Sequence, residues 1–292
     1  TNRMLLARKN FDCLATCPKG LEPLLASELS EIGAKGIKQT SGGVHFNCSQ
    51  KVLYLACLWS RFGNRILLSL GSFKLESVEQ MYHYCGQVRW EDHFSAHKTI
   101  SVNFAGRSSL IRHSIYGAQV VKDAVVDRFR RLNGERPTID LKQPDISIQG
   151  RLNRGRINLM LDMSGESLHR RGYRKGQGSA PLKENVAAAL LMRAGWPSIA
   201  AGSGSLVDPM CGSATFLIEA AMMAADIAPG LLRQRFGFHE WACHDEAIWK
   251  EILSHAVIRK QNGLKCLGSE IRGYDSDLRV LELARLNIEA IG

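Results

Sequence analysis

Hydrophobic and polar positions alternate in short blocks over residues 11–71, and the blocks switch between strand-like and helix-like spacing. The segment "FDCLAT" (residues 11–16) has the composition of a strand, and residues 19–34 carry apolar side chains on one helical face. "GGVHFN", "QKVLYLACLWSRF" and "RILLSLGSF" then predict a strand, a second amphipathic helix and a further strand. This strand–helix–strand–helix–strand order predicts a small ferredoxin-like α+β unit.

Residues 76–163 contain a second set of elements. "SVEQMYHYCG" predicts a helix, "KTISVNFAG" a strand and residues 114–132 a long amphipathic helix. Two alternating segments around Asn153-Arg154-Gly155 predict a β-hairpin. The basic stretch that follows is rich in glycine and serine, which is typical of a linker.

From residue 181 the pattern becomes that of a doubly wound α/β domain. A helix over residues 182–194, ended by Gly195 and Pro197, precedes a strand, a helix, a second strand and a second helix at residues 205–208, 213–227, 270–275 and 277–290. The predicted fold class is therefore an α+β N-terminal part followed by the first part of a Rossmann-like α/β domain. The predicted boundaries are 1–75, 76–165, 166–180 for the basic linker, and 181–292.

The charge is distributed unevenly between these parts. The chain has a net charge of +10, but residues 1–180 hold 27 Lys+Arg against 15 Asp+Glu, a net +12, whereas residues 181–292 hold 11 against 13, a net −2. A basic excess confined to one part indicates a polyanionic partner, of which nucleic acid is the usual one. A surface that is basic only for solubility is the alternative.

Composition excludes several classes of protein. The chain is 45% hydrophobic and 23% charged, no apolar run is long enough to cross a bilayer, and "TNRMLLARKNFD" lacks the apolar core of a signal peptide. The eight cysteines form no C-x-x-C, and the Cys13–Cys17 pair has no second pair at zinc-site spacing. We expect reduced thiols, no metal, no membrane partner and a cytoplasmic location.

The stretch "SLVDPMCGSATFLIEAA" (residues 205–221) reads as a buried strand, a tight loop and a helix N-terminus, an arrangement that often holds a nucleotide. It is not a phosphate-binding P-loop, because no lysine lies between Lys183 and Lys250, and Asp208 would repel a triphosphate. A carboxylate beside a helix N-terminus suits S-adenosylmethionine, which carries an ammonium, a carboxylate, a sulfonium and a ribose. The alternative is that Gly212 and Ser213 only let the helix approach the sheet.

A second acidic position follows the second predicted strand, in "EIRGYDSD". Asp275 is placed to accept hydrogen bonds from ribose hydroxyls, and Asp277 to cap the next helix. Asp275 lies 67 residues after Asp208, where about 20 is typical, so we expect a helical insert between them. A dinucleotide-dependent oxidoreductase is a weaker alternative, because the chain lacks G-x-G-x-x-G and has Asp-Pro before the loop.

These motifs resemble those of a known family. "DPMCGSATFLIEAA" resembles the D-P-x-C-G-S-G-T-x-x-I-E-A-A signature of Rossmann-like RNA guanine-N2 methyltransferases. The insert "APGLLRQRFGFHEWACHDEAIWKEI", "GYDSD" and the upstream "SGESLHRRGYR" and "APLKENVAAALLMRAGW" resemble bacterial large-subunit rRNA methyltransferases of the RlmL type, the first half of the bifunctional RlmK/L enzymes. The basic N-terminal region resembles their ferredoxin-like and THUMP domains, so the resemblance extends from Phe11 to Gly292.

The resemblance implies a set of residues at the cofactor. It puts six residues at the methionine side of S-adenosylmethionine: Asp208, Pro209, Cys211, Gly212, Ser213 and Thr215. It puts Asp275 at the ribose, and Lys183 either where the cofactor enters or on a plain helix surface. Glu219 either braces the loop or makes a polar contact from helix to sheet. Ala214 stands where the family has glycine. We expect an ordinary helical φ there, since a positive φ costs alanine about 1 kcal/mol or more.

A THUMP-like domain implies RNA recognised mainly through its backbone and shape. The candidate contacts to 23S rRNA, or to a pre-ribosomal large-subunit particle, are Arg107, Arg112, Lys122, Arg151, Arg154, Arg156, Arg170, Arg171, Arg174 and Lys175. Each of these taken singly is more often a solvated surface charge, so the prediction rests on the cluster. Tyr173 is a candidate for stacking on a base.

The motif that holds the target base in such enzymes, N/D-P-P-[YFW], is absent, because none of the eight prolines is adjacent to another. The pattern also reaches only two strand–helix units of the α/β domain. We therefore expect a piece of a longer enzyme that contains no catalytic residue and does not methylate alone. In the parent enzyme the guanine N2 would attack the methyl group directly, without a metal. The alternative function is a non-catalytic RNA-binding or assembly module.

Overall fold

The computed structural model describes residues 10–175 and 181–292. The described chain divides into two compact units, each built from separate stretches of sequence. Unit 1 comprises residues 10–14, 65–165 and 235–245, and unit 2 comprises residues 15–64, 166–175, 181–234 and 246–292. The division after Leu14 falls inside the first strand, β1 (Phe11–Thr16), which contributes to both units.

Unit 1 is a sheet covered by two helices. Its further elements are β4 (Arg65–Lys74), α4 (Val78–Gln87), η1 (Trp90–Asp92), β5 (Thr99–Ala105), α5 (Ser114–Asn133), β6 (Thr138–Ile139), β7 (Ile146–Asn153), β8 (Arg156–Asp162) and η2 (Gly237–Glu240). The strand order is β1-β4-β8-β7-β5-β6. Strand β8 pairs antiparallel with β4 and β7, and β5 pairs parallel with β7 and β6.

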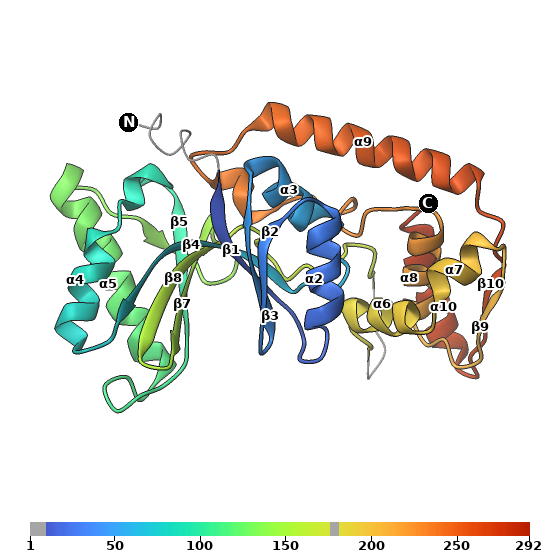
Figure 1. Cartoon of the computed structure of the whole chain (residues 1–292), viewed down its shortest axis with the longest axis horizontal. Coiled ribbons are helices and arrows are strands. Elements are labelled where there is room, and N and C mark those ends of the chain that lie inside the picture. Colours follow the sequence, from blue (N-terminus) through green and yellow to red (C-terminus); the bar gives the residue numbers. More distant parts are fainter. Residues whose placement is uncertain (1–9, 176–180) are drawn as a thin grey trace. The chain divides into compact units, whose positions relative to one another are not determined.

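Helices α4 and α5 lie side by side on one face of these strands (Figure 1). The apolar face of α5 buries Val121, Ala124, Val125 and Phe129, as its spacing predicts, and Phe129 packs on Phe94 with ring centroids 5.2 Å apart. The helix ends at Gly134, whose φ of 77° lets its N–H bond the carbonyl of Arg130.

The predicted hairpin between β7 and β8 is confirmed. Its two-residue loop, Arg154-Gly155, has φ values of 48° and 71°, which is the backbone of a type I′ turn. Glycine adopts such a φ without strain, whereas Arg154 is one of the few non-glycine residues of the described chain with positive φ.

The first part of unit 2 has one strand more than the pattern predicts. It contains α2 (Glu22–Glu31), β2 (Lys35–Thr40), β3 (Gly43–Cys48) and α3 (Gln50–Trp59), with strand order β2-β3-β1. Strand β2 was not predicted because most of its side chains are exposed and polar, so it carries no apolar alternation. The observed order along the chain is strand–helix–strand–strand–helix–strand, which is the full ferredoxin-like order.

The rest of unit 2 contains α6 (Glu184–Arg193), α7 (Trp196–Ala201), β9 (Leu206–Asp208), α8 (Thr215–Ala224), α9 (Glu246–Lys265), β10 (Ile271–Gly273) and α10 (Leu278–Glu289). Strands β9 and β10 pair in parallel, as a doubly wound domain requires. Helix α8 lies against both strands and against α6 and α7 (Figure 1). Its Leu217, Ile218 and Met222 are buried in a core with Ala284 of α10. Helix α9 confirms that the insert is helical.

One boundary differs from the prediction. Gly195 follows the end of α6 with a φ of 76°, but Pro197 lies in the first turn of α7 instead of ending a helix. Proline suits that position because the first N–H groups of a helix have no intrahelical acceptor. Among the described residues, no helix is both long and apolar enough to cross a membrane.

Candidate functional site

The parallel strands β9 and β10 bring the two predicted carboxylates to one edge of unit 2. Gly273 pairs with Asp208 in the register, and the backbone continues this pairing beyond the strands. The N–H of Tyr274 donates to the carbonyl of Asp208 at 2.8 Å, and the N–H of Cys211 donates to the carbonyl of Tyr274 at 2.8 Å. A side chain at position 273 would collide with Cys211 and Leu217, so glycine is required where β10 meets α8.

The loop after β9 is held by its neighbouring carboxylates. Oδ1 of Asp208 accepts from the N–H of Met210 at 3.0 Å, and Oδ2 of Asp275 accepts from the N–H of Gly212 at 2.9 Å. The N–H groups of Asp277 and Gly212 keep the pKa of Asp275 below its usual range. Burial, together with the charges of Asp208 and Asp275, raises the pKa of Cys211. Both carboxylates therefore act on the same loop.

The backbone at Ala214 contradicts the prediction of an ordinary helical φ. Ala214 has φ 70° and ψ 24°, in the left-handed region, and it is the N-cap of α8. The chain has to turn sharply between the carbonyl of Cys211, which accepts from the N–H of Ala214 at 2.9 Å, and the first turn of the helix. The site therefore keeps the conformation that glycine favours, at a cost of about 1–2 kcal/mol for a residue with Cβ.

The N-terminus of α8 faces the loop with its first N–H groups outside the helical ladder. The first bond from the helix to its cap runs from the N–H of Ile218 to the carbonyl of Ala214 at 2.9 Å. The N–H groups of Thr215, Phe216 and Leu217 come before it and are the donors that helix N-termini offer to anionic groups. Carboxylates on one side and helix donors on the other can bind a ligand that carries both charges.

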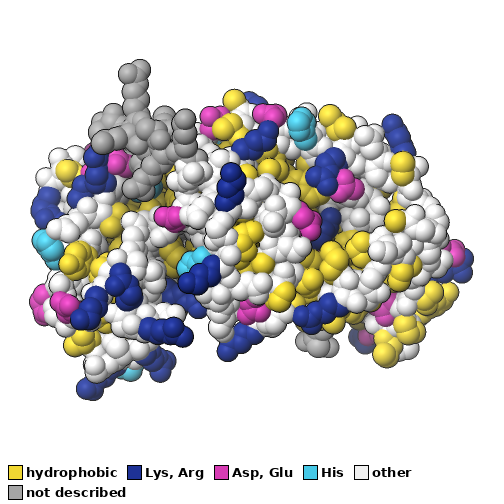
Figure 2. Space-filling model, viewed as in Figure 1, with side chains coloured by type: hydrophobic (Ala, Val, Ile, Leu, Met, Phe, Trp, Pro, Cys, Tyr) yellow, Lys and Arg dark blue, Asp and Glu magenta, His cyan; other side chains and the backbone are white. Residues whose placement is uncertain are grey.

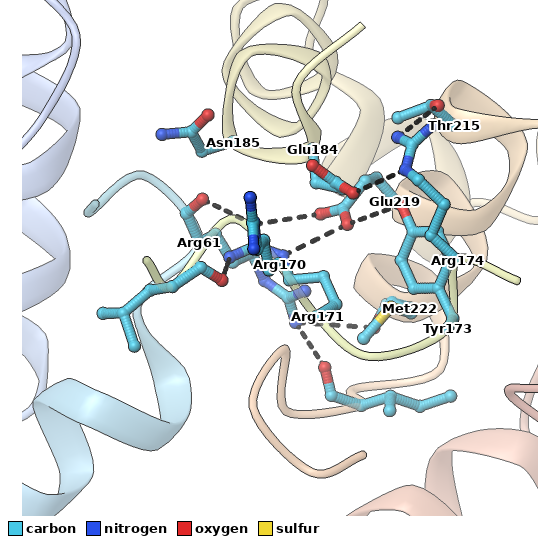
Figure 3. Close-up of polar contacts among 12 residues, drawn as sticks. Arg61, Arg170, Arg171, Tyr173, Arg174, Glu184, Asn185, Thr215, Glu219 and Met222 are labelled. Carbon is cyan, nitrogen blue, oxygen red and sulfur yellow. Dashed lines mark hydrogen bonds and ion pairs between the residues drawn. The ribbon is translucent and has the colours of Figure 1, made fainter. Parts of the chain in front are cut away.

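Arg174 is part of this site rather than a free basic side chain (Figure 3). Its Nη1 donates to Oγ of Ser213 at 3.2 Å, and its Nη2 donates to Oγ1 of Thr215 at 3.2 Å and to the carbonyl of Leu182 at 3.1 Å. Its Nε donates to Oε1 of Glu184 at 3.0 Å. The predicted RNA contact of Arg174 is therefore replaced by contacts to the loop.

Asn287 of α10 holds the loop from another side. Its Nδ2 donates to the carbonyl of Ser213 at 3.1 Å, and its Oδ1 accepts from the N–H of Lys175 at 2.7 Å. The side chain is fully buried, so these bonds are made away from water. Sequence reasoning missed Asn287. The signal that could have found it is a polar residue on the apolar face of the helix predicted at residues 277–290.

Arg171 and Tyr173 are buried, which is incompatible with their predicted contacts to RNA. The Arg171 side chain has no exposure, and its Nε and Nη2 lie 3.3 Å from the two carboxylate oxygens of Glu219 (Figure 3). The hydroxyl of Tyr173 donates to Glu219 at 3.4 Å. Glu219 thus holds the segment before α6. This role differs from both predictions for Glu219, which were to brace the loop or to make a polar contact from helix to sheet. Its signal was a carboxylate inside the apolar run "TFLIEAAMMA".

The same region contains a second carboxylate, that of Glu28. The carboxylate of Glu28 accepts from Oγ of Ser60 at 2.7 Å and from the N–H of Arg61 at 2.6 Å. Burial raises the pKa of Glu28 to about 7 despite these bonds. Arg61 in turn donates to the carbonyl of Ile227 at 2.9 Å.

The remaining predicted residues of unit 2 lie at the surface. Pro209 and Lys183 are exposed, and Lys183 is the N-cap residue of α6 without a side-chain cap bond. Arg170 is exposed and lies 3.6 Å from Glu166, and Lys175 is exposed. Residues 176–180 of the predicted linker lie outside the described residues.

The predicted RNA contacts of unit 1 gather mainly at one end of its sheet. Strands β5 and β7 run parallel with Ala105 opposite Arg151, so the loop after β5, with Arg107, lies at the same end as the Arg154 turn. A side chain at Gly106 would collide with the backbone of Leu152, which confirms how closely this loop approaches β7.

Arg156 lies opposite Lys74 at this end, and its guanidinium donates to the side chain and carbonyl of Ser72 at 3.3 Å. Figure 2 shows Lys and Arg side chains over this part of unit 1, at the lower left. Sequence reasoning missed Lys74, because it ends an apolar strand far from the hairpin in sequence. Arg112 is exposed just before α5. Lys122 lies within α5 and pairs with Asp123 at 2.6 Å.

Three family models match the chain in succession. The RlmL ferredoxin-like domain matches residues 12–67, the THUMP domain residues 76–162, and the RMKL-like methyltransferase domain residues 171–292. Within residues 10–175 and 181–292, no three His, Cys, Asp or Glu side chains are grouped to hold a metal ion.

Relatives and solved structures agree with these matches. The chain is 50% identical over 275 residues to ribosomal RNA large subunit methyltransferase K/L of Cellvibrio japonicus, covering 94% of this chain and 37% of the relative. It is 50% identical over 281 residues to the protein of the same name of Methylococcus capsulatus, covering 96% and 38%. The chain thus spans less than two fifths of the curated relatives it matches.

A crystal structure of SMU.472 complexed with SAH superposes with a TM-score of 0.84 at 29% identity, covering 98% of this chain and 73% of that one. The Thermus thermophilus TrmN structure shares the fold, with a TM-score of 0.64 at 19% identity, covering 97% and 70%. Along its length, the chain therefore carries domains of the RlmL ferredoxin-like, THUMP and RMKL-like methyltransferase families.

Proposed function

We propose that this chain carries the RNA-binding region and part of the S-adenosylmethionine site of an enzyme that methylates the exocyclic N2 of a guanine in 23S rRNA. The observation that carries the proposal is the loop of residues 208–215, where two carboxylates and a helix N-terminus face one another. The names of the curated relatives support an rRNA substrate, and the SAH bound to SMU.472 supports the cofactor.

The donors and acceptors at the loop fit this cofactor. The carboxylate of Asp275 suits ribose hydroxyls, and that of Asp208 suits the ammonium of the methionine part. The N-terminal N–H groups of α8 suit its carboxylate. Position 212 has open space where a Cβ would stand, which leaves its backbone accessible. When bound, the cofactor supplies a methyl group on a positively charged sulfur, and this chain's residues fix its position.

Binding of S-adenosylhomocysteine tests the cofactor proposal directly. Isothermal titration calorimetry of the 292-residue chain is expected to show binding that Asp275→Ala weakens about tenfold or more, the effect of losing a charge-assisted hydrogen bond. Asp226→Asn, at the other end of α8, is the matched control and is expected to bind as the wild type does. Equal affinity of Asp275→Ala and the wild type would place the ribose elsewhere.

We further propose that the chain alone binds without transferring a methyl group. Its support is the sequence, which contains no N/D-P-P-[YFW] to hold a flipped guanine. Incubation with 23S rRNA and cofactor carrying a radioactive methyl group is expected to leave the RNA unlabelled. Label in the RNA would contradict the proposal and would require another residue to hold the base.

A further inference from the structure

Arg174 joins three separate segments of unit 2 at the loop. Its guanidinium reaches Ser213 and Thr215 on either side of Ala214, the carbonyl of Leu182, and the carboxylate of Glu184. Figure 3 shows the contacts to Thr215 and Glu184. The planar fork of arginine allows these bonds to be made together, whereas the point charge of lysine does not. The side chain is only 16% exposed, so most of these bonds are shielded from water.

Glu184 determines what Arg174 can do. Its side chain is 5% exposed and lies 3.0 Å from Nε, so the two charges compensate each other within the site. A compensated guanidinium is a poor receptor for a further anion but a good rigid link. Arg174 therefore fixes two hydroxyl-bearing residues of the loop relative to the start of α6.

The segment that carries Arg174 is itself anchored to α8. Arg171 and Tyr173 contact Glu219, one turn after Thr215 on the same helix. The N–H of the next residue, Lys175, bonds Asn287, which in turn bonds the carbonyl of Ser213. The segment of residues 171–175 thus contacts the first two turns of α8 at Thr215 and Glu219. It also contacts Ser213 of the loop, directly through Arg174 and indirectly through Asn287.

We propose that Arg174 is a positioning residue for the cofactor loop, which it holds in the left-handed turn at Ala214 through Ser213 and Thr215. This inference rests on the proposed function for its ligand, S-adenosylmethionine. The strained φ at Ala214 needs surrounding contacts to persist, and the bonds from Arg174 lie on both sides of it. Loss of these bonds releases the loop and weakens cofactor binding, although Arg174 does not react.

The test compares three variants of the 292-residue chain. Arg174→Met combined with Glu184→Gln removes the link without leaving a buried unpaired charge, which keeps the fold intact. Arg174→Lys keeps the charge but loses the fork. Arg193→Met, an exposed arginine of α6 that bonds the carbonyl of Gly20, is the matched control. The measurements are the dissociation constant of S-adenosylhomocysteine and the hydrogen exchange of the amides of residues 211–217.

The double variant is expected to raise the dissociation constant about tenfold, a difference of about 1.4 kcal/mol, and to speed exchange in residues 211–217 but not in α3. Arg174→Lys is expected to have a dissociation constant and loop exchange rates close to those of the double variant, because lysine lacks the planar fork. If only the positive charge of Arg174 mattered, lysine would restore the wild-type values. Unchanged exchange at the loop, or unchanged affinity of the double variant, overturns the inference. A wild-type chain that binds no S-adenosylhomocysteine counts against the proposed function, and loop exchange then still decides whether Arg174 holds the loop.

Discussion

The guanidinium of Arg171 lies 3.3 Å from the carboxylate of Glu219, and neither side chain is exposed to solvent. Three backbone carbonyls, of Ser60, Arg61 and Leu168, accept the other hydrogen bonds of Arg171. A charge pair without water is tolerated only when its remaining hydrogen-bonding groups are also satisfied. This network ties the segment before α6 to the helix that follows the loop of residues 208–215 (Figure 3).

Breaking this pair from either side is expected to destabilise the chain strongly. Arg171→Met or Glu219→Gln alone should lower the free energy of unfolding by about 3–5 kcal/mol, because each leaves a buried charge unpaired. The double variant Arg171→Met with Glu219→Gln should cost less than the sum of the two single variants, with a coupling of about 1–3 kcal/mol. Urea denaturation of all four proteins measures this, and additive effects would show that the charges do not interact.

The left-handed φ of Ala214 leads to an expectation for its replacement by glycine. Glycine removes about 1–2 kcal/mol of strain but loses a buried methyl group, about 0.8 kcal/mol, and adds about 0.5–1 kcal/mol of chain entropy. Ala214→Gly is therefore expected to change the unfolding free energy by less than about 1 kcal/mol, because the opposing contributions nearly cancel.

Ala220 provides the control, since it is equally buried on the same helix but has helical backbone. Ala220→Gly should cost about 2 kcal/mol, from the methyl group and the helix propensity together. Similar losses for the two variants, measured by urea denaturation, would show that position 214 is not strained in solution.

The pH dependence of stability is expected to contain two opposing contributions. Glu28 has a folded pKa of about 7 against an ordinary 4.5, so the folded state keeps a proton that the unfolded state has lost between these values. Stability from this group is therefore lost as the pH rises from 4.5 to 7, by up to about 3 kcal/mol. Burial and four nearby cations lower the pKa of His169 to about 4 from 6.5, so its contribution is lost as the pH falls from 6.5 to 4.

Glu28→Gln separates the two contributions. Between pH 4.5 and 6.5 the stability of the variant should rise more steeply with pH than that of the wild type, because only in the wild type does the contribution of Glu28 oppose that of His169. Urea denaturation at half-unit steps of pH measures both profiles. Parallel profiles would mean that Glu28 titrates near its ordinary value in the folded chain.

The elements that bury a regular apolar face could be predicted from the sequence, and the contacts between distant segments could not. The spacing in α5 and the strand–loop–helix of residues 205–221 are local signals, so both were found. Strand β2 was missed because it pairs through its backbone while its side chains stay polar and exposed. Whether a backbone will pair at an edge is decided by its neighbour, β3, and not by its own pattern.

The candidate site shows the same limit for charged residues. The basic run "HRRGYRK" looks uniform in sequence, yet Arg170 is exposed, Arg171 is fully buried and Arg174 contacts Ser213 in the loop of residues 208–215. The positions of the latter two side chains depend on their carboxylate partners. Arg171 pairs with Glu219, 48 residues later in the sequence, and Arg174 pairs with Glu184, 10 residues later. A count of charges along the sequence detects the basic run, but it does not show which of its arginines are paired with buried carboxylates. The φ of Ala214 was mispredicted because the turn depends on contacts made by the backbone and by neighbouring residues, among them the bond from the N–H of Ala214 to the carbonyl of Cys211, and not on the alanine side chain.

The difference between exposed and buried arginines changes which residues should be replaced to test RNA binding. Arg151, Arg154 and Arg156 belong to a two-residue hairpin at the basic end of unit 1, and no ion pair within the described chain involves them. Replacing all three with alanine is expected to weaken binding to 23S rRNA fragments and to reduce the salt slope by up to about 2, since about 0.7 counterions are released per phosphate contact on single strands.

Replacing Arg170, Arg171 and Arg174 is a poor test of RNA binding, because the side chains of Arg171 and Arg174 hold the fold and the loop of residues 208–215. Arg279, which is 94% exposed on α10, provides the control, and Arg279→Ala should bind RNA as the wild type does. Filter binding at 50–200 mM salt measures the slope. An unchanged slope in the hairpin variant would place the RNA contacts on another surface, with the loop after β5 and Arg107 the next to be replaced.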